Sequence, residues 1–233
     1  MDVVDAFRAA ADSAIDRHPQ WGDPALLATR LSWAIAAVLH SDGAGLSLSS
    51  GDGLRVPLGS SSEPAALAER LQFTTGEGPC LEAETTADPI MATEAVMTHT
   101  WPIFAGRLLI ETPFRSIFSA PVAGVGTMDV YFTGPAGCLT VPVGDAVLVA
   151  EQVSAALSDP RHVRTIENEV TTGDAGGRHL VNIAMGMLTQ ARSISFPDAL
   201  AALRAHAFAA DLTLEQLADA VVAGTVPVGD LLP

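Results

Sequence analysis

Apolar residues recur with a helical period along the last quarter of the chain, from Leu180 to Val222. Spacings of three, four and seven residues place such side chains on one face of a helix with 3.6 residues per turn. The pattern predicts three short amphipathic helices, whose apolar stripes are Leu180, Ile183, Ala184, Met187, Leu188 and Ala191, then Phe196, Ala199, Leu200, Leu203 and Ala207, and then Leu214, Leu217, Ala218, Val221 and Val222. Three helices of this size bury little surface, so we expect them to pack against a partner chain or another domain.

Two of these helices also carry start signals. Ser195 stands three residues before Asp198, and Thr213 stands three residues before Gln216. In such a pair the hydroxyl accepts a hydrogen bond from an early helix N–H group, while the longer side chain reaches back to the helix start. Gly224, just past the third stripe, predicts the end of that helix.

Upstream of residue 159, helical and extended patterns alternate. We expect helices at 3–17, 24–40, 63–72, 99–110 and 141–158, strands at 43–49, 54–59, 90–92, 114–122 and 125–133, and a long loop at 73–88. The sequence Gly51-Asp52-Gly53 predicts a hairpin turn between the first two strands. Strands in the middle of a segment flanked by helices favour an α/β or α+β domain with an antiparallel sheet.

Two motifs stand out against this pattern. The first is Ile183-Ala184-Met185-Gly186-Met187-Leu188, followed by Ser195, Ala199-Leu200, Leu203-Arg204, Leu214, Leu217-Ala218 and Val221-Val222. It resembles the ANTAR domain, a small helical RNA-binding module of bacterial antitermination regulators. The second is Leu71-Gln72-Phe73-Thr74-Thr75-Gly76-Glu77-Gly78-Pro79-Cys80-Leu81-Glu82-Ala83, followed by Trp101-Pro102-Ile103-Phe104. It resembles the GAF sensor domain, which commonly precedes ANTAR in bacterial proteins.

The resemblance implies a two-module protein. Its fold would be an α/β (α+β) GAF-like antiparallel sheet flanked by helices, followed by an all-α three-helix ANTAR-like module. The expected boundaries are an N-terminal helix at 1–19, the GAF-like sensor at 20–158, a linker or helix extension at 159–177, the three-helix module at 178–226 and a tail at 227–233.

The same resemblance implies a function. The state of the sensor would control whether two ANTAR modules are presented to tandem RNA hairpins that govern transcription termination. Two alternatives remain open at this point. The first is a degenerate descendant of the family, in which the helical module serves only for dimerisation or protein contact. The second is a ligand-binding protein whose output passes through another regulator.

Charge weakens the RNA-binding hypothesis. The net charge is −15, of which residues 178–233 contribute −2 from three arginines and five acidic residues. RNA binders usually present a basic surface, because neutralising phosphates and releasing counterions supply most of the affinity. The acidic balance therefore counts against RNA binding, although the helical pattern of the module is retained.

Candidate RNA-binding positions follow from helical geometry. Residues seven apart drift only about 20° around a helix, so Arg178, Met185 and Arg192 are expected on one exposed side. The full candidate set adds flanking polar residues and one arginine of the next helix: Arg178, Asn182, Met185, Thr189, Arg192 and Arg204. Related ANTAR sequences commonly carry lysine at the position of Met185. They often show Asn-Arg-Lys where this chain has Asp211-Leu212-Thr213.

A candidate small-molecule pocket centres on the glycine loop. Two glycines one residue apart allow backbone angles closed to other residues, and the proline that follows them stiffens the loop's exit. The predicted pocket residues are Phe73, Gly76, Gly78, Cys80, Trp101 and Phe104. The alternative is a structural lid on a filled core, and the residues alone favour it slightly.

No catalytic or metal-binding constellation is visible, so we expect no enzyme activity, no cofactor and no metal. Gly124 and Gly126 lack the third glycine of a dinucleotide site, and the histidines are scattered. Cys80 and Cys138 have no redox or metal spacing, which favours two free thiols in a cytoplasmic protein without a membrane span. The helices expected at 3–17 and 141–158 carry more apolar residues than one small sheet can cover. We therefore expect them to pack against a second copy of the chain in a homodimer.

Overall fold

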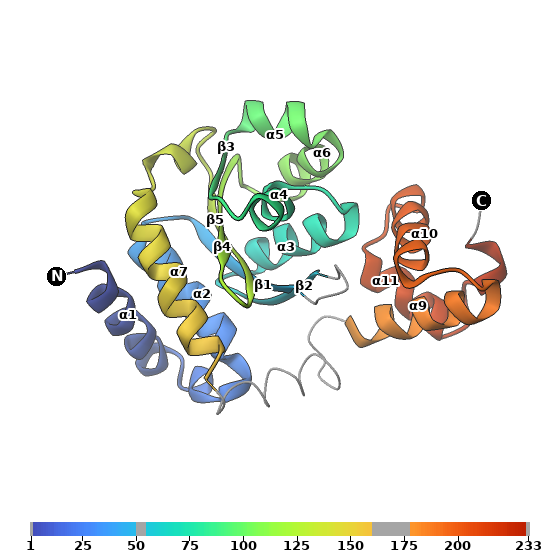
Figure 1. The fold of residues 1–233 in the computed structure, drawn as a ribbon, viewed down its shortest axis with the longest axis horizontal. Coiled ribbons are helices and arrows are strands. Elements are labelled where there is room, and N and C mark those ends of the chain that lie inside the picture. The colour runs from blue at the N-terminus through green and yellow to red at the C-terminus, as the bar shows by residue number, and fades with distance from the viewer. Residues whose placement is uncertain (1, 50–54, 160–177, 232–233) are drawn as a thin grey trace. The chain divides into compact units, whose positions relative to one another are not determined.

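A computed structural model describes residues 2–49, 55–159 and 178–231, and it divides into two compact units (Figure 1). The first unit comprises residues 1–73 and 77–165, and the second comprises 74–76 and 166–233. The predicted hairpin turn at 51–53 and nearly all of the predicted linker lie outside the described residues. No helix within the described ranges is both long enough and apolar enough to cross a membrane.

The first unit is an α+β domain around a five-stranded antiparallel sheet. The strands are β1 (Gly43–Ser49), β2 (Arg55–Ser60), β3 (Ile90–Ala92), β4 (Ser116–Val122) and β5 (Gly126–Phe132), in the order β2-β1-β5-β4-β3. The register pairs Ser47 with Thr127 and Ser119 with Asp129. All five strands were expected from the sequence, within two residues of the observed bounds.

Helices cover both faces of this sheet. α1 (Val3–Arg17), α2 (Leu27–Val38) and α7 (Val143–Leu157) lie together on one face, and α3 (Glu63–Thr75) and α4 (Pro79–Thr86) lie on the other (Figure 1). α5 (Glu94–Thr100) and α6 (Pro102–Glu111) follow β3, and short 3₁₀ turns occupy Pro19–Gly22, Pro24–Leu26 and Gly137–Thr140.

The structure corrects one expectation about this unit and removes part of the basis of another. The predicted loop at 73–88 contains helix α4, which begins at Pro79, a residue suited to the first helical turn. The predicted homodimer rested on uncovered apolar length, yet α1 buries Phe7 and Ala14 and packs against α2 and α7 of its own chain. Dimerisation stays a prediction, but the first helix no longer supports it.

The described residues of the second unit form three helices at the positions that the sequence predicts. They are α9 (Arg178–Arg192), α10 (Phe196–Ala209) and α11 (Leu214–Val222), followed by a 3₁₀ turn at Val228–Asp230. Ser195 Oγ accepts from the Asp198 N–H at 3.3 Å, and Thr213 with Gln216 forms a complete capping box. Both predicted helix starts are therefore confirmed.

The buried side of α9 differs from the predicted stripe. Ile183 is 46% exposed, whereas Met185 is only 4% exposed and lies in the core with Val181, Ala184 and Leu188. These four residues also show helical spacing, so the sequence offered two overlapping stripes, and packing selected the one starting at Val181. Phe196 of the second predicted stripe is exposed as well.

Candidate ligand site

The two faces of the sheet carry different side chains. On β5, Met128 and Val130 point to the side of α2 and α7, whereas Thr127, Asp129 and Tyr131 point to the side of α3 and α4. Residues paired across antiparallel strands point to the same face, so Gly59 shows the direction of Leu46 and Met128, and Gly45 shows that of Asp129. A Cβ on Gly59 would meet α2, whereas a Cβ on Gly45 would meet Glu69 of α3. The polar face is nevertheless buried, since α3 and α4 cover it.

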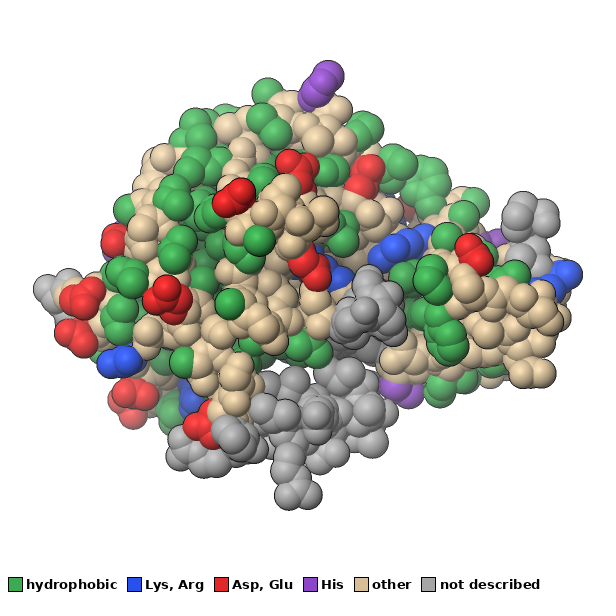
Figure 2. All heavy atoms as spheres, in the orientation of Figure 1, with side chains coloured by type: hydrophobic (Ala, Val, Ile, Leu, Met, Phe, Trp, Pro, Cys, Tyr) green, Lys and Arg blue, Asp and Glu red, His purple; other side chains and the backbone are tan. Residues whose placement is uncertain are grey.

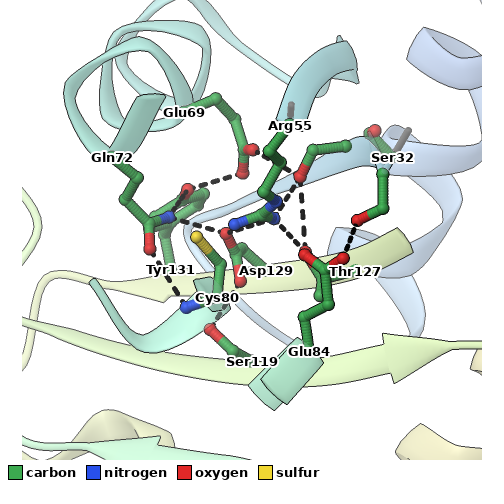
Figure 3. Close-up of polar contacts among 12 residues, drawn as sticks. Ser32, Arg55, Glu69, Gln72, Cys80, Glu84, Ser119, Thr127, Asp129 and Tyr131 are labelled. Carbon is green, nitrogen blue, oxygen red and sulfur yellow. Dashed lines mark hydrogen bonds and ion pairs between the residues drawn. The ribbon is translucent and has the colours of Figure 1, made fainter. Parts of the chain in front are cut away.

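Eight polar side chains fill the space under α3 and α4 (Figure 3). We call them the polar cluster, and all of them are at most 5% exposed: Ser47, Arg55, Glu69, Gln72, Ser119, Thr127, Asp129 and Tyr131. They come from four strands and from α3. Burying this many polar groups costs free energy unless each finds a partner.

Asp129 sits at the centre of the polar cluster. Its carboxylate accepts from Gln72 Nε2 at 2.7 Å and from Ser119 Oγ at 2.5 Å, and it lies 3.8 Å from Arg55 Nη2. The Gln72 amide oxygen in turn accepts from the Cys80 N–H at 3.1 Å. Gln72 therefore connects the first turn of α4 to the central carboxylate.

Arg55 enters the cluster from the edge strand β2. Its Nη2 donates to the hydroxyls of Ser47 on β1 and Thr127 on β5, the next two strands of the sheet. Its Nε is buried and has no hydrogen-bond partner. The guanidinium is thus the only cation of the cluster, and one of its donors is unused.

Glu69 supplies a second carboxyl beside Asp129. Burial, followed by the negative charge of Asp129, raises the pKa of Glu69 from 4.5 to about 8, although Arg55 lowers it. Tyr131 donates its hydroxyl proton to Glu69 Oε1 at 2.6 Å, and burial together with the two carboxyls raises the pKa of Tyr131 well above its usual value. At neutral pH the cluster therefore holds a protonated Glu69 and one Arg55–Asp129 ion pair.

Two glycines make room for the polar side chains of α3. A Cβ on Gly45 of β1 would overlap the Glu69 carboxyl, and a Cβ on Gly78 would overlap the Gln72 amide. Gly78 also has φ +143°, which strains other residues. The sequence motif at Gly78 is therefore a packing requirement of the cluster.

The structure separates the residues of the predicted pocket. Trp101 and Phe104 lie in an apolar core with Leu71, Phe114 and Tyr131, as the lid alternative expects. Phe73 is buried too, whereas Gly76 is exposed with φ +69° and is grouped with the second unit. Gly78 and the backbone of Cys80 lie against Gln72 of the polar cluster. A ligand role for these six residues stays a prediction.

Sequence reasoning missed the members of the polar cluster. The alternation of polar and apolar residues in β1 and β5 is the signal of a sheet with one solvent-facing side. Here α3 and α4 bury that side, which strand periodicity cannot reveal. The usable signal was the presence of Arg55, Asp129 and Tyr131 in strands whose other face is fully apolar.

The predicted RNA-binding residues do not form one exposed face. Asn182 is exposed, and Thr189 and Arg204 are partly buried. Arg192 is exposed and donates to the Gly229 carbonyl at 3.0 Å. Arg178 opens α9, and its side chain lies outside the described residues. Met185 is buried, so its expected exposure was wrong. Cationic side chains are also sparse on the face in Figure 2.

Metal binding finds no support in the described part of the chain. No group of three or more histidine, cysteine, aspartate or glutamate side chains is placed to hold an ion there. Cys80 and Cys138 are free and buried, and burial raises the pKa of the Cys138 thiol.

Comparison with known proteins adds little to this site. No family model matches the chain, and no curated protein matches it. The chain is similar to a crystal structure described as a domain of a two-component sensor histidine kinase protein from Sinorhizobium meliloti 1021, with 16% identity and a TM-score of 0.41. The alignment covers 61% of this chain and 91% of that one.

Proposed function

We propose that this chain is a signal-responsive regulator. Its α+β unit binds a small molecule that carries both hydrogen-bond donors and acceptors, and the polar cluster is the binding site. The observation behind this proposal is a buried sheet face made of polar residues. A face selected only for stability would be apolar, because a buried ion pair is often no more stabilising than apolar residues of the same size.

The chemistry of the cluster suits such a ligand. Arg55 and Gln72 donate, Asp129 accepts, and Glu69 can do either while it is protonated. A ligand that replaces part of this network would exchange one set of hydrogen bonds for another, so binding would reorganise α3 and α4. That reorganisation is the signal a sensor needs.

A thermal-shift screen tests the sensor. The full chain is melted with a panel of amino acids and nucleobases, and at least one member is expected to raise the melting temperature of the wild type. The double variant Arg55→Met/Asp129→Asn should lose that rise. The double variant Arg107→Met/Glu111→Gln removes an ion pair from the surface of the same unit and should retain it.

Two results would contradict the sensor proposal. One is a panel in which no member stabilises the wild type. The other is a ligand that stabilises the wild type and the Arg55→Met/Asp129→Asn variant equally, because that ligand would bind away from the polar cluster.

For the helical unit we propose protein contact as the output, in preference to the RNA binding that the ANTAR resemblance implies. Residues 178–233 contain only three arginines, and Arg192 already donates to a backbone carbonyl. The unit instead exposes large apolar side chains at Ile183, Phe196 and Phe208. Aromatic side chains such as those of Phe196 and Phe208 are enriched in protein interfaces.

A salt-titrated gel shift with a tandem-hairpin RNA separates the two outputs. We expect no complex with the full chain even at low salt, and no difference between the wild type and Arg192→Ala. A complex that weakens with salt and loses about one phosphate contact in Arg192→Ala would establish RNA binding in place of protein contact.

A further inference from the structure

The outer side of α10 forms a shallow apolar groove in the helical unit. The groove has a volume of about 540 Å³ and is lined by Ile194, Asp198, Ala201, Ala202, Ala205, His206, Ala209 and Leu231. Four of these residues are alanines of α10, and three of the four are exposed. Small side chains allow a second helix to approach closely, at the short end of the usual 8–10 Å between helix axes.

The two ionisable residues of the groove are arranged symmetrically about Ala202. Asp198 lies four residues before Ala202, and His206 lies four residues after it. With a rise of 1.5 Å per residue, each lies about 6 Å along the helix from Ala202, on opposite sides of it. The groove therefore has an acidic half and a half that can donate from an imidazole, with alanine between them.

We propose that this groove is a self-complementary interface, in which α10 packs antiparallel against α10 of a second copy of this chain. A two-fold axis through Ala202 places Asp198 opposite the partner subunit's His206, and His206 opposite the partner subunit's Asp198. Each interface then holds two such pairs around a core of alanines. An interface that uses the same patch on both copies closes as a dimer.

Complementary hydrogen-bonding groups select a second copy as the occupant, because the Asp198 acceptor and the His206 donor match the same two groups on a reversed helix. The chain carries a net charge of −15, so two copies repel one another unless the contact itself offsets the repulsion. The Asp198 and His206 pairs provide that offset locally. This inference deepens the protein-contact function proposed for the helical unit by naming its partner. It is tested without RNA or sensor ligand, so either proposal can fail alone.

Sedimentation of the full chain over a dilution series measures the association. We expect a dimer at micromolar concentration, and Ala205→Arg should weaken it by about tenfold or more because the added side chain fills the groove. Ala191→Arg, at an exposed alanine of α9, is the matched control and should leave the dimer unchanged. A wild-type monomer, or equal dimerisation of the wild type and Ala205→Arg, would overturn the proposal.

Charge reversal tests the pairing independently of packing. His206→Glu alone places like charges opposite each other and should weaken the dimer, and Asp198→Lys added to it should restore association. Circular dichroism checks that each variant keeps its helices. If the His206→Glu variant is folded but the added Asp198→Lys does not restore its association, the proposed register is contradicted.

A cysteine cross-link tests the position of the axis. In Ala202→Cys the two new thiols lie across the two-fold axis, within the distance that a disulfide spans. Glutathione disulfide should therefore convert this variant to a covalent dimer, which reductant reverses. Ala191→Cys should stay monomeric on a denaturing gel under the same conditions. Equal cross-linking of the two variants would show random collision and would reject the interface.

Discussion

The two faces of the central sheet are equally buried but chemically opposite. The face toward α2 and α7 presents Leu46, Phe118, Met128 and Val130, whereas the face toward α3 and α4 presents the polar cluster. The same strands supply both faces, so strand propensity cannot explain the contrast. The helices above each face explain it, because α3 carries Glu69 and Gln72 toward the sheet.

The contrast indicates how each face contributes to stability. The apolar face stabilises by removing surface from water, and its contributions are close to additive over separate sites. The polar face stabilises only as a complete network, because a single missing partner leaves a buried group unsatisfied. We therefore expect the polar face to respond cooperatively to substitution and to pH, which the apolar face should not.

The largest expected effects come from one substitution on each face. Phe118→Ala and Arg55→Met should each lower the free energy of unfolding by about 3–5 kcal/mol, the first by opening a cavity and the second by leaving Asp129 unpaired. Adding Asp129→Asn to Arg55→Met should recover most of the loss. Urea unfolding measures the free energy of unfolding of all three variants. An Arg55→Met variant as stable as the wild type would show that the Arg55–Asp129 ion pair does not contribute to stability.

A pH effect specific to the polar face is the next largest. The pKa of Glu69 is about 8 when folded and about 4.5 when unfolded, so the folded state keeps a proton that the unfolded state loses between these values. Stability should therefore be full below pH 4.5, fall as pH rises toward 8, and level off above it. The slope is at most about 1.4 kcal/mol per pH unit.

Glu69→Gln isolates this contribution. The amide keeps an acceptor for Tyr131 but cannot ionise, so the variant should lose the fall in stability between pH 5 and pH 8. Glu82→Gln, at an exposed position, should behave like the wild type. Denaturation midpoints at pH 5, 7 and 9 compare the three proteins. An unchanged slope in Glu69→Gln would assign the pH dependence to other groups.

A smaller effect on stability is expected when Gly45, which lies against Glu69 of the polar cluster, is compared with Gly106, which lies outside the polar cluster. Gly45→Ala should cost about 1–3 kcal/mol, because its Cβ overlaps the Glu69 carboxyl. Gly106→Ala on α6 meets no neighbour and should stabilise by about 0.4–1 kcal/mol. Thermal melts at one pH suffice for both variants. A tolerated Gly45→Ala would mean that α3 can move away from the sheet.

Local sequence patterns predicted most elements of the fold. The strands at Gly43–Ser49 and Ile90–Ala92 and the helix at Val3–Arg17 have the predicted bounds, and the capping residues Ser195 and Thr213 start their helices as expected. These features depend on residues close in sequence, so periodicity and capping chemistry suffice to predict them. Helix α4 was missed because its short, partly polar pattern is preceded by two glycines.

Tertiary packing decided the rest. Whether a polar strand face meets water or a covering helix depends on contacts between residues far apart in sequence, such as Gln72 with Asp129 and Arg55 with Thr127. The choice between the two apolar stripes of α9 was likewise made by its neighbours, which buried Met185 and exposed Ile183. The sequence by itself thus determined which segments are helices and strands, because those preferences are local. Only the tertiary structure determined which side chains share an interior, because burial belongs to the assembled domain.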